Sequence, residues 1–546
     1  MSQSDLPLKA TSARVSSDRA SSTRTDGVGE KEEEAEYLLS GPQIQGQQRQ
    51  RQERRTNLPS WPQIGLLAWA IIATVIALVL AVLSKAQQQD PPLSSSPSAS
   101  AAATPKQRPP PPQWPSDDEY GPKKPKGKRN LVFMVSDGMG PTSLHMTRSY
   151  RQWAEGLPID DVLVLDQHHI GTSRTRSSSS LVTDSAAGAT AFSCGDKSYN
   201  GAISVLPDHS PCGTVLEAAA LAGYKTGLVV TTRLSDATPA CFASHVTLRD
   251  YEDRIAEQEI GLHPLGRVTD LLLGGGRCHF LPKSIPGSCR GDDVDLVAEA
   301  VNNQGFHIVN DRVGFDSLQK GNNVQLPLLG LFADTDIPYE IDRRNQSDVY
   351  PSLEEMSRTA LKALSEATKD SEQGFFLMIE GSRIDHAGHS NDPAAQVHEV
   401  IAYDKAFAAV AEFLENDPVQ SALVATSDHE TGGLAAARQL HKNYPEYAWF
   451  PGVLARANHS AEHVAKQLHN HQLRGGSESS RRQYIVKDLL EEGLGITDAV
   501  SWEVDALVKG SLPIEYMFAD IISRRAQTGW TTHGHSGKWI HTHSSN

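Results

Sequence analysis

Short apolar runs recur through the chain after residue 130, and polar residues follow each of them directly. The runs cover residues 131–135, 227–230, 270–273, 375–379 and 422–425. Their apolar residues are continuous rather than alternating, which is typical of strands buried on both faces of a parallel sheet. The pattern therefore predicts an α/β fold with a mostly parallel central sheet.

Helical patterns lie between these runs. Ser352 and Glu355 have the spacing of a capping box, and a stripe of Leu353, Met356, Leu361 and Leu364 begins there, just before the 375–379 run. Residues 211–218 precede the 227–230 run in the same way. Alternating helices and strands predict helices on both faces of the sheet, with ligands bound at the carboxyl ends of the strands.

The pattern before residue 130 is different. Residues 1–63 are rich in Ser, Gln, Arg and Glu and predict a disordered tail. Residues 64–83 are an uncharged apolar run whose length matches the hydrocarbon core of a bilayer. We interpret this run as a single transmembrane helix, a signal anchor, with a buried core helix as the alternative. Residues 84–129 are a Pro-, Ser-, Ala- and Lys-rich stalk, and residues 130–546 form the globular domain.

Charged residues around the apolar run predict its orientation. Arg49, Arg51, Arg54 and Arg55 precede it, whereas Lys85 alone follows closely. Positive charge remains on the cytosolic side, so we expect a single-pass type II membrane protein whose globular domain is lumenal.

Three short motifs fit this topology. Asn345 and Asn458 begin Asn-x-Ser sequons on the expected lumenal side, where a glycoprotein carries its glycans. Glu34, Leu38 and Leu39 in the cytosolic tail resemble an acidic dileucine signal for a sorting adaptor. A solvated charge run beside two chance leucines is the alternative.

The net charge and the number of cysteines restrict which partners and which disulfides are expected. The 546 residues carry a net charge of −15, which argues against nucleic acid as a partner. Five cysteines are too few for a disulfide framework, and their odd number leaves at least one thiol. Cys278 and Cys289 flank a short loop and are the preferred pair, with two free buried thiols as the alternative.

One segment places a hydroxyl beside a carboxylate. Asp184 and Ser185 lie in residues 182–190 and are followed mainly by small residues. A serine at a helix start can be approached closely and can attack a phosphoryl group that the helix N-terminus holds. The alternative is that Asp184 or Ser185 only caps a helix.

Acids and histidines gather after the predicted strands and in the late 533–535 segment. They are Asp137, Asp236, Glu380, Asp385, His389, Asp428, His429, His533 and His535, and Thr238 adds a hydroxyl oxygen beside Asp236. Imidazole with carboxylate suits zinc, and an all-oxygen set suits magnesium. Any one of these acids alone is a cap or a surface charge, but their common position at strand ends indicates a metal site. Arg249 adds a planar guanidinium that can hold two phosphoryl oxygens, unless it forms only a surface salt bridge.

Residues 133–140, 182–191, 236–239, 245–249, 380–389 and 427–433 carry a resemblance to a known family. In these motifs the chain resembles the alkaline phosphatases, and among them the membrane-anchored fungal vacuolar type, from about residue 130 to 537. The resemblance implies hydrolysis of phosphate monoesters at alkaline pH through a phosphoserine intermediate. It also implies a homodimer in the vacuolar membrane.

The resemblance implies roles for the motif residues. Ser185 would be the phosphorylated nucleophile, and Arg249 would hold the phosphate oxygens. One Zn²⁺ would bind Asp385, His389 and His535, a second Zn²⁺ would bind Asp137, Asp428 and His429, and one Mg²⁺ would bind Asp137, Asp236, Thr238 and Glu380. For the last zinc histidine, the motif context favours His535 over His533.

Two positions depart from the family pattern. His386 follows Asp385 where bacterial relatives carry lysine, which affects the metal and pH preference. Residues 537–546 do not resemble the family, so we expect a truncated or altered end that lacks a strand and leaves a sheet neighbour unpaired. Two alternatives to a monoesterase follow: a related metallo-phosphodiesterase or sulfatase, and an inactive anchored product.

Overall fold

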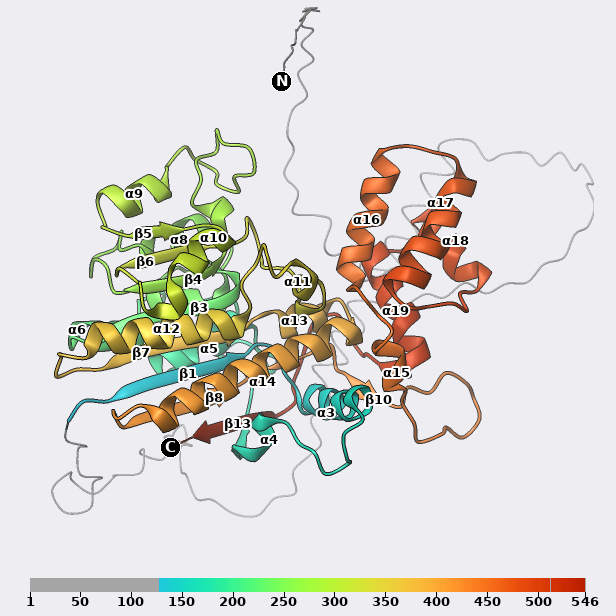
Figure 1. The fold of residues 1–546 in the computed structure, drawn as a ribbon, viewed down its shortest axis with the longest axis horizontal. Helices are drawn as coiled ribbons and strands as arrows, with labels where there is room; N and C mark the ends of the chain where they lie inside the picture. The colour runs from blue at the N-terminus through green and yellow to red at the C-terminus, as the bar shows by residue number, and fades with distance from the viewer. Residues whose placement is uncertain (1–126, 511, 546) are drawn as a thin grey trace, which may run out of the picture. The chain divides into compact units, whose positions relative to one another are not determined.

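The computed structural model describes residues 127–510 and 512–545 (Figure 1). The predicted tail at 1–63, the predicted span at 64–83 and the stalk up to residue 126 lie outside the described residues. Among the helices of the described ranges, none combines the length and the apolar content that a bilayer span requires.

A nine-stranded sheet forms the centre of the domain. Its strands are β1 (Asn130–Ser136), β2 (His169–Ser173), β3 (Lys225–Arg233), β4 (Leu271–Gly275), β5 (His307–Val309), β6 (Leu328–Leu331), β7 (Phe375–Gly381), β8 (Ser421–Thr426) and β13 (Ile540–Ser545). The order is β2-β13-β8-β1-β7-β3-β4-β6-β5. All strand pairs from β8 to β5 are parallel, and β13 runs antiparallel to both of its neighbours. The predicted mostly parallel sheet and its five predicted strands are confirmed.

Helices cover both faces of this sheet. They are α3 (Pro141–Glu155), α4 (Val164–Gln167), α5 (Ser185–Cys194), α6 (Val215–Leu221), α7 (Ala237–Ala243), α8 (Glu252–Glu259), α9 (Leu296–Asn302), α10 (Arg312–Ser317), α11 (Glu340–Arg343), α12 (Leu353–Thr368), α13 (Arg383–His389) and α14 (Pro393–Asn416). The Ser352 hydroxyl accepts from the Glu355 N–H, as the capping box predicts. The helix expected at 211–218 begins later, at Val215, because Thr214 is its cap and Cys212 forms a disulfide.

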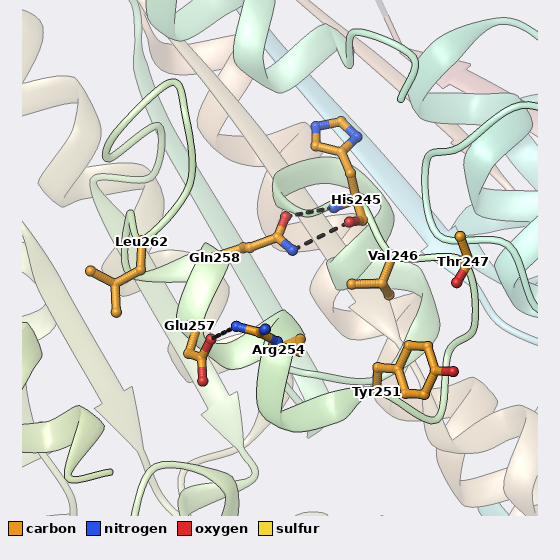
Figure 2. A pocket seen from close by; sticks show the side chains of 8 residues that line it. All are labelled: His245, Val246, Thr247, Tyr251, Arg254, Glu257, Gln258 and Leu262. Carbon is orange, nitrogen blue, oxygen red and sulfur yellow. Dashed lines mark hydrogen bonds and ion pairs between the residues drawn. The ribbon is translucent and has the colours of Figure 1, made fainter. Parts of the chain in front are cut away.

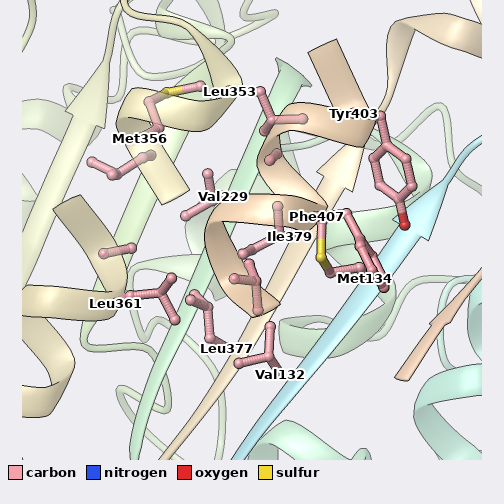
Figure 3. Close-up of a cluster of buried hydrophobic side chains, with 14 of the residues drawn as sticks. Val132, Met134, Val229, Leu353, Met356, Leu361, Leu377, Ile379, Tyr403 and Phe407 are labelled. Atoms are coloured by element: carbon pink, nitrogen blue, oxygen red, sulfur yellow. The ribbon is translucent and has the colours of Figure 1, made fainter. Parts of the chain in front are cut away.

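The core shows why the strands are apolar throughout. Every residue of β7 is buried, and Leu377 and Ile379 pack with α12 and α14 on one face of the sheet (Figure 3). Phe376 and Met378 point to the other face, into a cluster with α6 and α7. Because successive side chains of a strand alternate between faces, a strand covered on both sides is apolar along its length, and the polar Glu380 of β7 stands only at its carboxyl end.

A second group of helices packs on a core that it shares with α3, α13 and α14. It comprises α15 (Pro451–Leu454), α16 (Ala461–Leu473), α17 (Glu478–Tyr484), a π-helical stretch (Ile485–Gly493), α18 (Ser501–Lys509) and α19 (Ile514–Ala526). Four short strands accompany the sheet: β9 (Glu430–Thr431) pairs with β12 (His535–Ser536), and β10 (Ala435–Ala436) pairs with β11 (Thr528–Gly529). The β9–β12 pair brings the end of the chain beside β8.

The expectation that the C-terminal end lacks a strand is wrong. Residues of β13 pair with β8 on one side and with β2 on the other, inside the nine-stranded sheet. Ile540, His543 and Ser545 are buried there. Strand pairing uses backbone N–H and C=O groups, which every residue except proline supplies in full, so a segment without recognisable motifs still completes the ladder. The structural reason for expecting an inactive product is thereby removed.

Two disulfides are present among the described residues. Cys278–Cys289, the preferred pair, is confirmed. Cys194–Cys212 was not predicted, and it ties the end of α5 to the loop before α6. Cys241 is a buried free thiol, as the odd number of cysteines requires.

Candidate active site

The predicted site residues meet at the carboxyl ends of four adjacent strands. Asp137 follows β1, Glu380 lies at the end of β7, and Asp428 follows β8. Asp236 follows β3 by three residues and caps α7. Because these strands are parallel neighbours, their ends lie at one edge of the sheet, as the sequence pattern predicts.

Ser185 is the first residue of α5 and is only 2% exposed. Asp184, not Ser185, is the helix cap: its carboxylate accepts from the Ala187 and Gly201 N–H groups. The small residues after Ser185 have a structural purpose, because a Cβ at Gly188 would stand 3.0 Å from the Asp428 Cβ. The helix can therefore approach the strand ends closely and leave the Ser185 hydroxyl at the site.

Asp137, Asp428 and His429 converge beside Ser185. The His429 Nε2 lies 3.1 Å from the Ser185 Oγ, 3.2 Å from the Asp428 Oδ2 and 3.5 Å from the Asp137 Oδ1. A Ser-His-Asp triad uses opposite ring nitrogens for the hydroxyl and the carboxylate. Here one nitrogen faces both, which is the arrangement of ligand atoms around one ion.

A second set contains Asp385, His389 and His535. Asp385 and His389 lie on α13, and the His389 Nε2 lies 3.1 Å from the Asp385 Oδ2 and 3.2 Å from the His535 Nε2. Their ligand atoms lie within 4.8 Å of one another. His533 is not a member: its Nδ1 contacts the His389 carbonyl, and its ring stacks on Tyr516.

The arginine lies on the other side of the site. The Arg249 Nη2 donates to the Asp236 Oδ1 at 2.9 Å, and its Nη1 lies 3.8 Å from the Asp184 Oδ2. Asp236 also pairs with Arg233, at 3.2 Å. Thr238 is buried in the first turn of α7, and the Glu380 carboxylate accepts from the Ser382 hydroxyl. Thr238 and Glu380 are thus buried, and the half-buried Asp236 carboxylate contacts the guanidinium directly.

Crowded carboxylates perturb one another in this site. Burial, and then the charge of Asp428, raise the pKa of Asp137 well above its ordinary value. Burial likewise raises the pKa of Glu380 to about 8, opposed by the Ser382 hydrogen bond and reinforced by Asp236. Each of these two acids therefore retains its proton to a higher pH than an exposed carboxyl does.

The histidines compensate part of this charge. Burial opposes a charged His389, but the Asp385 carboxylate outweighs burial and raises the pKa of His389 to about 9. The pKa of His429 is raised in the same way by Asp428, against burial. Burial, and then the charge of His429, lower the pKa of His535 to about 4. In the metal-free chain, protons on His389 and His429 supply positive charge that bound cations otherwise supply.

The donor atoms fit metal ions. The Asp137 Oδ1 and the Asp428 Oδ2 are buried and accept no hydrogen bond from the described residues. A buried carboxylate oxygen without a donor costs free energy unless a cation faces it. The set of Asp137, Asp428 and His429 and the set of Asp385, His389 and His535 each combine carboxylate with imidazole. These are ligand types that transition metals bind.

Sequence reasoning assigned no role to Thr431. Its hydroxyl donates to the Asp385 Oδ1, and it lies 3.2 Å from the His429 Nδ1, so it links the two sets. Its position two residues after His429, in a predicted strand-end segment, was the available signal. His386 lies 3.9 Å from the Asp236 Oδ2 and 3.6 Å from the Asp336 Oδ2, at the edge of the site, where its departure from the family pattern was expected to matter.

A pocket of about 320 Å³ lies behind the segment that carries the arginine (Figure 2). It is lined by His245, Val246, Thr247, Tyr251, Arg254, Glu257, Gln258 and Leu262. The Gln258 side chain binds the backbone N–H and C=O of His245, as the dashed lines in Figure 2 show. None of the predicted catalytic or metal residues lines this pocket. The pocket therefore lies outside the site, next to the segment 245–251.

Comparisons with known proteins agree with this geometry. A sequence profile described as alkaline phosphatase matches residues 128–544, past the point at which the resemblance was expected to stop. The repressible alkaline phosphatase of Saccharomyces cerevisiae is 55% identical over 75% of this chain and 74% of that protein. An alkaline phosphatase of Schizosaccharomyces pombe is 50% identical over 74% of each chain. The crystal structure of Thermus thermophilus alkaline phosphatase superposes with a TM-score of 0.64 at 29% identity, over 77% of this chain and 86% of that one.

Proposed function

This chain belongs to the alkaline phosphatase family and is a phosphate monoester hydrolase, and on this basis we propose that Ser185 carries the phosphoryl group during turnover. The observation that supports this assignment most directly is the position of the Ser185 Oγ. This oxygen lies at the N-terminus of α5, 3.1 Å from the His429 Nε2. His429 forms one candidate metal-binding set with Asp137 and Asp428. The helix N-terminus favours the negative charge of a phosphoryl group at the same point.

The reaction then takes two displacements. The Ser185 Oγ forms a bond to phosphorus, the bond from phosphorus to the ester oxygen breaks, and the alcohol leaves with a proton. Water then attacks the phosphoserine, the bond to the Ser185 Oγ breaks, and inorganic phosphate is released. Asp184 holds the start of α5, so the hydroxyl keeps one position through both steps.

The family is metal-dependent, and we assign the individual ions from their donor atoms. Asp385, His389 and His535 would hold one Zn²⁺, and Asp137, Asp428 and His429 the other, because each set joins carboxylate with imidazole. Asp137, Asp236, Thr238 and Glu380 would hold Mg²⁺, because all four supply oxygen. When bound, such ions neutralise phosphoryl charge and lower the pKa of a hydroxyl. The Asp236 carboxylate would also fix the Arg249 guanidinium.

The contribution of Arg249 to the rate should differ between monoesters and diesters, so its removal distinguishes a monoesterase from a diesterase. Arg249→Ala should lower kcat/KM for p-nitrophenyl phosphate by about 10²- to 10³-fold, because a charged donor to the phosphoryl oxygens is lost. The loss for bis-p-nitrophenyl phosphate should be smaller, because a diester has one fewer non-bridging oxygen. Rates for both substrates give the monoester to diester ratio.

Arg254→Ala is the matched control, since the Arg254 side chain is 74% exposed and pairs only with Glu257. It should keep both rates. A wild-type chain that prefers the diester, or an Arg249→Ala chain with an unchanged ratio, would favour the metallo-phosphodiesterase alternative; faster hydrolysis of a sulfate ester would favour the sulfatase.

We also propose that the domain is lumenal and anchored by residues 64–83, in the vacuolar membrane. The support is the apolar run, its flanking arginines, the Glu34, Leu38 and Leu39 motif and the family resemblance. Asn345 and Asn458 are both exposed, as glycan acceptors must be. The chain should resist carbonate extraction, and endoglycosidase should shorten it unless both asparagines are changed to glutamine. A carbonate-soluble, unglycosylated chain would contradict this topology.

The resemblance to the family further supports a homodimer. Sedimentation of the detergent-solubilised chain should give twice the chain mass. A monomeric mass for the active protein would contradict this assembly.

A further inference from the structure

A second cluster of metal-ligand side chains lies outside the residues described above. Asp342 belongs to α11, His459 lies two residues before α16, and His463 lies in the first turn of α16. One carboxylate oxygen and two imidazole nitrogens from this cluster lie within 4.8 Å of one another. The donors come from two segments more than one hundred residues apart in the sequence, and the fold brings them to one point.

The spacing of the donor atoms fits one transition-metal ion. The Asp342 Oδ1 lies 3.0 Å from the His459 Nδ1 and 3.8 Å from the His463 Nδ1. Two ligands about 2.1 Å from a tetrahedral zinc ion stand roughly 3.4 Å apart, and the two observed separations bracket this value. The rings of His459 and His463 are stacked, with centroids 4.1 Å apart and planes at 9°. A metal ion binds an imidazole nitrogen in the plane of the ring, so one of the two rings would tilt out of the stack for both Nδ1 atoms to face one ion.

The surroundings of the cluster match those of metal-bound histidines. The far nitrogen of His463, Nε2, lies 2.8 Å from the Gln467 side-chain amide. A histidine that binds metal with one nitrogen usually has the other fixed by a polar partner, and a half-turn of the Gln467 amide presents its oxygen to the Nε2–H. His459 and His463 are 28% and 29% exposed, so water can supply a fourth ligand.

Helix capping alone does not account for this arrangement. The Asp342 carboxylate, 4% exposed, accepts the Ser460 N–H at 3.2 Å, and that contact needs neither histidine. Ser460 itself caps α16 through the His463 N–H. Two imidazoles nevertheless converge on the same carboxylate oxygen. We propose that Asp342, His459 and His463 form a further Zn²⁺ site, with water as the fourth ligand.

An ion there would join two parts of the fold. It would fix the start of α16 to α11, which lies in the chain between the sheet strands β6 and β7. Glu462, between the two histidines, pairs with Arg383 at 2.6 Å, and Arg383 begins α13. The proposed site is thus structural: it holds α16 in the position from which Glu462 reaches α13.

Metal content of the full-length chain tests the proposal. After removal of all metals, the wild type and a His459→Gln/His463→Gln variant are dialysed against the same micromolar Zn²⁺, and bound zinc is measured by mass spectrometry. The variant should bind one zinc per chain less than the wild type. His441→Gln/His469→Gln removes two exposed imidazoles instead and should bind as much zinc as the wild type. Equal zinc in the His459/His463 variant and the wild type would overturn the site.

A second measurement does not depend on how the variant folds. Crystals of the wild type equilibrated at the same zinc concentration should show anomalous scattering at the zinc edge between Asp342, His459 and His463. Anomalous density at the active site without density here would overturn the proposal. The His459/His463 variant should keep its rate per molecule with p-nitrophenyl phosphate, which separates this site from the catalytic assignments.

Discussion

Ser185→Ala should lower kcat for p-nitrophenyl phosphate by at least about 10³-fold while the chain stays folded. The first displacement has no other nucleophile in this position, because the hydroxyl that faces the His429 Nε2 belongs to Ser185. The fold should tolerate the change, since alanine favours helices and Asp184, which caps α5, is retained. Steady-state rates and thermal unfolding of the same preparation check both statements.

A second readout identifies the intermediate. Wild-type chain quenched in acid during turnover of ³²P-labelled substrate should carry label on the peptide that contains Ser185, and Ser185→Ala should carry none. Ser193→Ala is the matched control, because Ser193 is a buried serine at the other end of the same helix. It should keep activity and label. Turnover of Ser185→Ala above a tenth of the wild-type rate would show that another group is the nucleophile.

Removal of the metals should abolish activity and make stability strongly dependent on pH. Without cations, protons on Asp137, on Glu380 and on the site histidines must offset the negative charge of the site, in which Asp385 and Asp428 stay ionised. Glu380 holds its proton to about pH 8 in the folded chain against an ordinary value of 4.5, and the pKa of Asp137 is raised as well. The unfolded chain releases these protons at lower pH, so rising pH favours the unfolded state.

His389 and His535 define the pH range of this effect. The pKa of His389 is raised to about 9, so its stabilising charge is complete below about pH 6.5 and is lost as pH rises through 9. His535, with a pKa lowered to about 4, acts in the opposite direction, but only below about pH 6.5. Between pH 6.5 and 9 the free energy of unfolding of the metal-free chain should therefore fall, with a slope of at most about 1.4 kcal/mol per pH unit for each group.

Urea unfolding of chelator-treated and metal-loaded chains at three pH values between 6.5 and 9 measures this slope. The loaded chain should lose much less stability, because the cations replace the protons. Zinc with magnesium should restore activity, and metal analysis then reports which ions the site takes. Equal slopes for both forms, or full activity after exhaustive chelation, would contradict the assignment of these carboxylates as metal ligands.

Strands and strand ends were predictable because their signal is local. A run such as 375–379 can be apolar throughout only if both faces of the strand are covered, and that condition fixes a parallel sheet with its ligands at the carboxyl ends. The Ser352 capping box was predictable for the same reason, since it involves residues three apart. The start of the helix at Val215 has the same local signal, a capping box of Thr214 and Glu217, which the expectation of a helix from residue 211 overlooked.

The C-terminal segment shows a feature of the fold that local sequence patterns did not predict. The recognisable motifs end before residues 537–546, yet the family profile matches to residue 544 and β13 completes the sheet, because β8 and β2 offer it a backbone ladder on both sides. Thr431 illustrates the same point within the site. Its contact with His429 is local, but its hydroxyl reaches Asp385 only because β9 passes α13 in space, so no spacing in the sequence reveals that second contact.

The sequence by itself determined the α/β class, the family and the strand ends at which the candidate site residues stand, because periodicity and motif order depend on neighbouring residues. Only the tertiary structure decided which residues share a point in space: that one nitrogen of His429 faces Ser185, Asp428 and Asp137, that His535 rather than His533 joins Asp385 and His389, and that Asp342 meets His459 and His463. Each set joins segments that are more than a hundred residues apart in the sequence. Only the packing of strands and helices decides whether such segments meet in space.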